Sequence, residues 1–209
     1  MSGEMSLLMA EPELVSDRDD AQFELLLRTR RELDVPDGWR AEIIDGDIRL
    51  MAPPSDPHNL IANRIHKVLA RHVPDEWGVY QTLGVHIGKI DDLYVPDVVV
   101  IPDAVVSDPE KSPNPAEEAL LVVEIVSRGN AGSDRKKKLW GYAHGNVPLY
   151  LLVDRWSAGG PSVTLYEQPE GGFYRKHSTV PFGEKVHLPE PIGSEVDTER
   201  FPGPDWGRS

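Results

Sequence analysis

The spacing of apolar residues along the chain predicts helices and strands in mixed order. Apolar positions that recur every three to four residues predict helices over residues 21–33, 57–73 and 132–146. Continuous or alternating apolar runs predict strands over residues 40–44, 47–51, 78–87, 98–101, 119–126 and 149–153. A further hairpin, which we expect at the periphery, covers residues 162–180. Strands joined through a crossover helix favour an α/β (α+β) fold in which helices flank a mixed sheet.

The two ends of the chain differ in composition from its middle. Residues 1–20 lack a sustained period, so we expect a flexible leader, with order beginning near Ala21. Residues 21–190 are expected to form a single domain, and residues 191–209, rich in Pro, Gly and acidic side chains, a loosely attached tail. The sequence has neither the run of roughly 18 apolar residues that a membrane helix needs nor a secretory signal pattern. We therefore expect a cytoplasmic protein without membrane contact.

The composition limits the chemistry that the chain can perform. It has no cysteine, which excludes disulfides, thiolate metal sites and cysteine nucleophiles. The formal charge of −13 argues against a general nucleic-acid binder, because phosphate contacts come from Lys and Arg. Residues 1–20, with six acids against one Arg, and residues 190–209, with five against two, carry much of that charge. A nucleic-acid substrate remains compatible with the sequence if divalent cations or a local basic surface assist.

Two acidic residues stand in strongly apolar strands, where an unpaired charge is costly. Asp97 precedes the strand over residues 98–101, and Glu124 lies within the strand over residues 119–126. Burying a lone carboxylate costs several kcal/mol unless a partner or an ion offsets the charge. Two carboxylates with water and phosphate oxygens are the ligands that Mg²⁺ prefers, so we expect Asp97 and Glu124 to share an ion. Alternatively, Asp97 caps a turn and Glu124 lies on the solvent face of an edge strand.

A basic run opens the helix predicted over residues 132–146 and offers a lysine to the same site. Lys138 falls within about 40° of Tyr142 on the helical wheel, and Tyr142 belongs to the apolar stripe. Lys137 faces away from that stripe, whereas Lys136 is not excluded by this geometry. An ammonium beside an ion could orient the attacking water or stabilise the transition state. The alternative is a solvated Lys138 that pairs only with Asp134, one helical turn earlier.

These motifs together resemble the Uma-two family of the PD-(D/E)xK nuclease superfamily. The matching motifs include Pro96-Asp97, Glu124 in VVEIVS, the run DRKKKLWGYA from Asp134 and the stretch GNVPLYLLVD from Gly145. The resemblance implies a restriction-endonuclease-like core, a magnesium site formed by Asp97 and Glu124, and phosphodiester hydrolysis. It further implies that Glu42 joins the metal shell or holds a water. The chain departs from the usual superfamily pattern at Val126, where a lysine is common, and the resemblance then points to Lys138.

The sequence therefore predicts a metal-dependent endonuclease that uses Mg²⁺, or Mn²⁺, to cut DNA. A catalytically inactive nuclease-like module that binds nucleic acid or a protein is the alternative, and a small phosphorylated substrate is a third reading. Cutting both strands of a duplex favours a homodimer. His58, near a helix start, either contacts phosphate or is merely a loop residue, and we favour the loop residue. The tryptophans are expected to serve packing, because no regular interval suggests a base-stacking platform.

Overall fold

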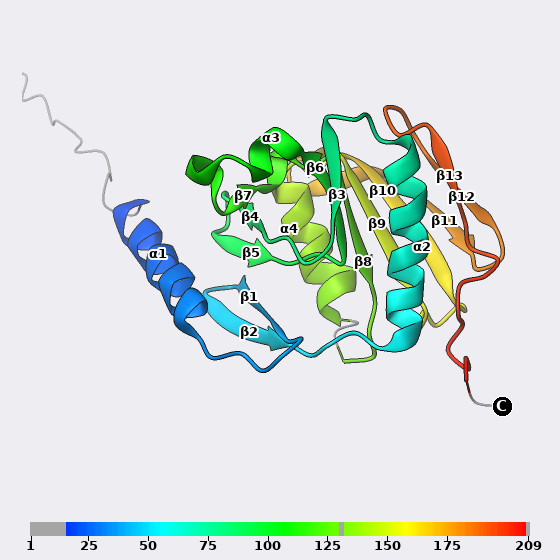
Figure 1. Cartoon of the computed structure of the whole chain (residues 1–209), viewed down its shortest axis with the longest axis horizontal. Helices are drawn as coiled ribbons and strands as arrows, with labels where there is room; N and C mark the ends of the chain where they lie inside the picture. Colours follow the sequence, from blue (N-terminus) through cyan, green and yellow to red (C-terminus); the bar gives the residue numbers. More distant parts are fainter. Residues whose placement is uncertain (1–15, 130–131, 208–209) are drawn as a thin grey trace, which may run out of the picture.

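The computed structural model describes residues 16–129 and 132–207, which fold into two sheets and a small hairpin with helices around them (Figure 1). The α-helices are α1 (Ser16–Glu32), α2 (Asp56–His72), α3 (Asp103–Val106) and α4 (Leu139–His144). Short 3₁₀ turns span Pro109–Lys111 and Ala116–Glu118, and a π-helical turn, Ser133–Lys138, leads directly into α4. The predicted leader over residues 1–15 lies outside the described residues. None of the described helices has the length and apolar character needed to span a bilayer.

The central sheet has six strands in the order β11-β10-β9-β8-β6-β3. Their bounds are β3 Trp77–Tyr80, β6 Val98–Pro102, β8 Leu121–Ile125, β9 Leu149–Asp154, β10 Ser162–Glu170 and β11 Phe173–Pro181. β8 and β9 pair in parallel, whereas every other pair in this sheet is antiparallel. The sheet is therefore mixed, as the sequence predicts. The hairpin expected at the periphery forms β10 and β11, which lie at one edge of the central sheet.

Helices cover both faces of the central sheet. On one face, Ile61, Ile65 and Leu69 of α2 join a cluster with the inward side chains of β6, β8 and β9. On the other face, Tyr142 of α4 packs with Val122 and Tyr150. β6 and β8 are consequently buried on both sides, which explains their nearly continuous apolar sequence.

The second sheet has the order β2-β1-β5-β4-β7 and lies beside the first, with α1 packed against it (Figure 1). Its strands are β1 Arg40–Ile44, β2 Asp47–Met51, β4 Val85–Ile87, β5 Asp92–Tyr94 and β7 Asn114–Pro115. Asp45 and Gly46 have φ of 53° and 74°, as a tight two-residue hairpin requires, and the predicted β1–β2 hairpin is confirmed. This sheet delivers β1 to the edge of the site described below.

Several elements differ from the sequence prediction. The strand expected over residues 78–87 is two strands, β3 and β4, in different sheets, because the chain turns between them at Thr82 (φ 60°). β5 was not predicted at all. The first helix begins at Ser16 rather than near Ala21.

The C-terminal segment is not a loosely attached tail over residues 192–201. β13 (Ser194–Asp197) pairs with β12 (Lys185–Leu188). Ile192, Val196 and Phe201 are buried in the cluster under α2. Alternate apolar residues outweigh the acidic and proline-rich composition here, because even a four-residue strand can bury one face.

Candidate active site

Asp97 and Glu124 lie opposite each other at one end of the central sheet. Val98 pairs with Val123 across β6 and β8, so the same register places Asp97 against Glu124. Both residues are buried, with 7% and 4% of their surface exposed. The Ile125 N–H donates to Oδ2 of Asp97 at 2.8 Å. The register thus places the two acids that the sequence singled out at paired positions on neighbouring strands.

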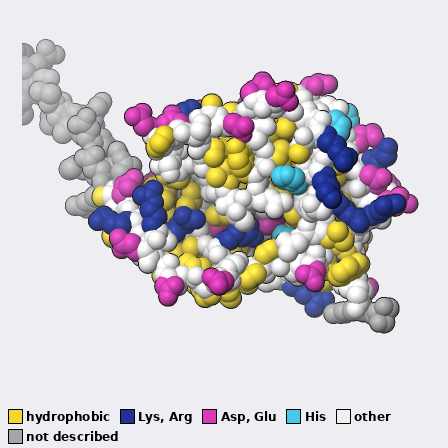
Figure 2. Space-filling view, viewed as in Figure 1, with side chains coloured by type: hydrophobic (Ala, Val, Ile, Leu, Met, Phe, Trp, Pro, Cys, Tyr) yellow, Lys and Arg dark blue, Asp and Glu magenta, His cyan; other side chains and the backbone are white. Residues whose placement is uncertain are grey.

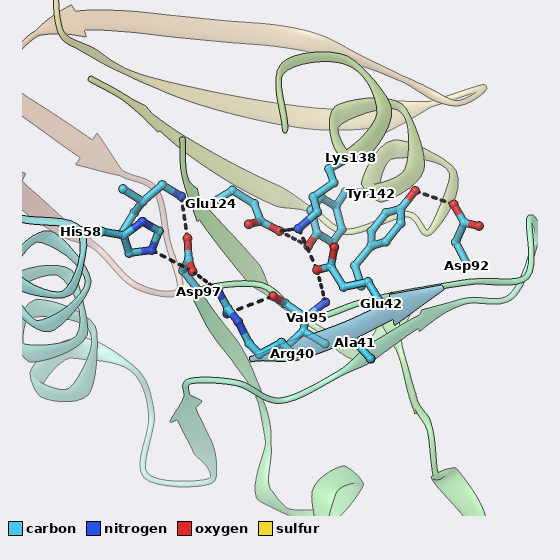
Figure 3. Close-up of polar contacts among 12 residues, drawn as sticks. Arg40, Ala41, Glu42, His58, Asp92, Val95, Asp97, Glu124, Lys138 and Tyr142 are labelled. Carbon is cyan, nitrogen blue, oxygen red and sulfur yellow. Dashed lines mark hydrogen bonds and ion pairs between the residues drawn. The ribbon is translucent and has the colours of Figure 1, made fainter. Parts of the chain in front are cut away.

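Lys138 brings a positive charge into the same cluster (Figure 3). Its Nζ lies 2.8 Å from Oε1 of Glu42 and 3.0 Å from Oε1 of Glu124, and the residue is only 2% exposed. Lys136 is exposed, and Lys137 pairs with Asp45 outside the cluster. Of the three lysines, Lys138 is therefore the one that the fold directs to Glu42 and Glu124.

The turn that carries Lys138 is tied to the sheet by a two-pronged ion pair. Arg135 donates from Nε and a terminal nitrogen to the Asp154 carboxylate at the end of β9, at 2.7 and 2.9 Å. This pairing holds the π-helical turn against the strand next to β8. π-helical turns are rare and frequent at functional sites, because they re-aim a side chain within a helix.

Glu42 reaches the cluster from β1 of the second sheet. It is 1% exposed, and its Oε1 accepts hydrogen bonds from the Val95 N–H and from Lys138 Nζ, both at 2.8 Å. Its second oxygen, Oε2, is buried and has no hydrogen-bond partner among the described residues. A buried carboxylate oxygen without a partner is energetically costly and marks a position where a water or ion can bind.

Tyr142 completes the cluster, although the sequence indicated only a core position for it. Its hydroxyl donates to Oε1 of Glu124 at 2.6 Å. Burial, followed by the charge of Glu124, raises the pKa of the Tyr142 hydroxyl well above its usual range, so the group stays a donor. The spacing of four residues from Lys138 was the available signal, since it places both side chains on one helix face.

Asp97 is held from its other side by two basic groups. A terminal nitrogen of Arg40, in β1, donates to Oδ1 at 3.2 Å, and Nε2 of His58 lies 2.9 Å from the same oxygen. Burial alone would raise the pKa of Asp97, but contacts with His58, Arg40 and the Ile125 N–H hold it below its ordinary value. The interpretation of His58 as a loop residue is wrong, because it lies buried in the first turn of α2. Arg40 was missed; its position two residues before Glu42 puts both on one strand face.

The cluster borders a cleft of about 500 Å³. Besides the charged residues above, Trp39, Trp156 and Arg128 line it, with the Arg128 guanidinium 4.4 Å from the centre of the Trp156 ring. Two tryptophans therefore reach a common cleft despite having no regular spacing in the sequence. The cleft offers charged groups of both signs and apolar walls.

The donor set suits an ion held by few protein ligands. Among the described residues, no group of three or more His, Asp or Glu side chains is arranged to enclose a metal. Mg²⁺ ordinarily uses one or two carboxylates and fills its shell with water and phosphate oxygens. Asp97 and Glu124, side by side at the cleft, match that requirement.

Comparison with known proteins identifies the family. The sequence matches the Uma2 family, described as “Putative restriction endonuclease”, over residues 22–199. The chain belongs to the Uma2 family. A crystal structure from Anabaena variabilis ATCC 29413, titled “a putative nuclease belonging to DUF820”, superimposes with a TM-score of 0.64 at 17% identity. The superposition covers 86% of this chain and 96% of the Anabaena chain. No curated protein matches the chain. The predicted family and restriction-endonuclease-like fold are confirmed.

Proposed function

We propose that this Uma2 protein is a metal-dependent endonuclease that hydrolyses phosphodiester bonds in DNA. The observation that carries the proposal is the position of Lys138, whose Nζ lies between the carboxylates of Glu42 and Glu124, while Asp97 lies across from Glu124 on the neighbouring strand. Acids on neighbouring strands with a buried ammonium are the parts that phosphodiester hydrolysis needs. The description of the family as a restriction endonuclease supports the same reaction class.

Asp97 and Glu124 would hold Mg²⁺, or Mn²⁺. When bound, the ion supplies a Lewis acid that lowers the pKa of a water and neutralises charge on the phosphate. The lowered pKa of Asp97 keeps that ligand ionised at neutral pH. Arg40 pairs with Asp97, and Lys138 pairs with Glu124. An ion held by the two carboxylates would take the place of these contacts, and Arg40 and Lys138 would supply positive charge for the phosphate.

The remaining residues orient these groups. Glu42 fixes the Lys138 ammonium by an ion pair. The ammonium then orients the attacking water or stabilises the charge that develops on the phosphate. The Tyr142 hydroxyl fixes the orientation of the Glu124 carboxylate. Glu42 and Tyr142 belong to ordered elements, β1 and α4, so Lys138 and Glu124 are positioned before substrate binds.

Cleavage of supercoiled, linear and single-stranded DNA, with Mg²⁺, Mn²⁺ or EDTA, tests the proposal. The wild-type protein should cut only with metal, and the variants Asp97→Asn and Glu124→Gln should lose at least a hundredfold in rate while remaining folded. Glu118→Gln is the matched control, because Glu118 pairs with Lys111 away from the cleft. Metal-independent cutting, or full activity in the Asp97 and Glu124 variants, would refute the assignment.

The internal neutralisation of both acids also favours a second candidate, a catalytically inactive module that binds nucleic acid. Arg40 and Lys138 satisfy the carboxylates without any ion. Titration of Mg²⁺ by calorimetry separates the candidates. In a catalytically inactive module, the wild type should show no heat of Mg²⁺ binding that is lost in the Asp97 and Glu124 variants. Sedimentation of the protein alone and with duplex DNA tests the proposed homodimer.

A further inference from the structure

The outer face of α2 carries a regular stripe of polar side chains. Asn59, Asn63, Lys67 and Arg71 follow one another at intervals of four residues, and all four are exposed. The opposite face of the helix is buried in the core. With a rise of 1.5 Å per residue, this α2 stripe is about 18 Å long. Its side chains offer amide, ammonium and guanidinium donors.

The α2 stripe is basic in an otherwise acidic protein. The chain has a formal charge of −13, yet α2 contains Arg64, Lys67 and Arg71 against a single acid, Asp56. Within residues 16–129 and 132–207, neither Lys67 nor Arg71 forms an ion pair, while Arg64 donates to the carbonyl of Arg200. Figure 2 shows Lys and Arg side chains gathered over α2 and the strands beside it. Two charges left without internal partners can be used by a ligand.

The same helix leads to the proposed catalytic cleft. His58, in the first turn of α2, immediately precedes Asn59, and its Nε2 lies 2.9 Å from Oδ1 of Asp97. The stripe therefore starts beside the cleft and runs away from it along the surface. Side-chain amides, Lys and Arg are the groups that bind the phosphates of nucleic acids without reading the sequence.

We propose that the α2 stripe docks the sugar-phosphate backbone of the nucleic acid whose scissile phosphate enters the cleft. This assignment rests on the proposed function for the identity of the ligand. The stripe supplies a local basic surface for phosphates, although the chain as a whole is acidic. It holds the backbone on one side of the cleft and so sets the direction in which the strand passes Asp97 and Glu124.

The test is the salt dependence of DNA binding in EDTA, where cleavage does not interfere. Fluorescence anisotropy with a labelled 20-base-pair duplex would compare the wild type with Lys67→Gln/Arg71→Gln. Because each phosphate contact contributes a slope of about −0.9 in log K against log salt, the variant's slope should be shallower by about 1.8. Arg28→Gln/Lys89→Gln is the matched control. It removes the same charge at exposed sites on the α1 side of the molecule, and its slope should stay unchanged.

The other outcomes overturn the proposal. An unchanged slope in the stripe variant, equal weakening in both double variants, or no binding by the wild type would each exclude docking by the α2 stripe. Cleavage is scored separately. If the stripe variant has a shallower salt slope but the wild type never cuts DNA, the docking surface is supported and the endonuclease is refuted. If the wild type cuts DNA with metal but the stripe variant keeps the wild-type slope, the endonuclease is supported and the docking surface is refuted.

Discussion

Replacement of Lys138 by Met tests whether one buried ammonium balances two carboxylates. The substitution keeps most of the side-chain volume and removes the charge that lies 2.8 Å from Glu42 and 3.0 Å from Glu124. Among the contacts of the described residues, Glu42 keeps the Val95 N–H as a donor and Glu124 keeps the Tyr142 hydroxyl. Neither of these donors carries a positive charge, so two negative groups remain buried side by side.

The expected loss of unfolding free energy follows from that burial. Removing one partner of a buried ion pair typically costs about 3–5 kcal/mol, because it leaves an uncompensated charge. This is a large part of the roughly 5–15 kcal/mol that stabilises a typical domain. The second substitution Glu42→Gln, made in the Lys138→Met background, should restore part of the loss because it removes one of the two negative charges.

Urea unfolding followed by circular dichroism in EDTA measures these free energies. Lys137→Met is the matched control, since the Lys137 side chain is 42% exposed and pairs with Asp45 at the surface. Exposed pairs contribute about 0–1 kcal/mol, so this control should barely change the midpoint. A loss below about 1 kcal/mol for Lys138→Met, or one equal to the control, would refute the charge-balance reasoning.

Two further predictions concern Tyr142 and Asp92. Tyr142→Phe should lower the unfolding free energy by roughly 1.5–3 kcal/mol, because Glu124 loses a charged hydrogen bond. Equal losses in urea unfolding for Tyr166→Phe, whose ring is only half-buried, would contradict this. Burial raises the pKa of Asp92 from 3.8 to about 6, although the Tyr94 hydroxyl opposes the shift. The folded state therefore binds the proton more tightly, so wild-type stability relative to Asp92→Asn should fall by roughly 1–3 kcal/mol between about pH 4 and pH 6 and then level. A rise over that interval would contradict the sign.

The sequence predicted the central sheet well because its signals there are local and strong. The strands around Val98 and Val123 are apolar on both faces, and only a doubly covered sheet buries such runs. The same apolar surroundings made Glu124 conspicuous. An acidic residue in an apolar strand is thus a signal that the sequence alone can supply, and it pointed to the candidate site.

The errors arose where long-range contacts decide the structure. Arg40 and His58 come from distant segments and meet Asp97 only through the packing of both sheets. Tyr142 was assigned to the core from its period, and the pattern could not show that its hydroxyl meets Glu124. The bend at Thr82 divides one apparent strand between two sheets, and a positive φ at threonine has no sequence signature.

The lysine of this site comes from a helical turn, while the acid beside it belongs to a strand. Val126, two residues after Glu124, packs among apolar neighbours instead of carrying the cation. The cation and the acid that it balances therefore belong to separate elements of the chain. Neutral replacements at Lys138 and Glu42 together would remove one negative charge along with the positive one, and so would cost the scaffold less than the loss of Lys138 alone.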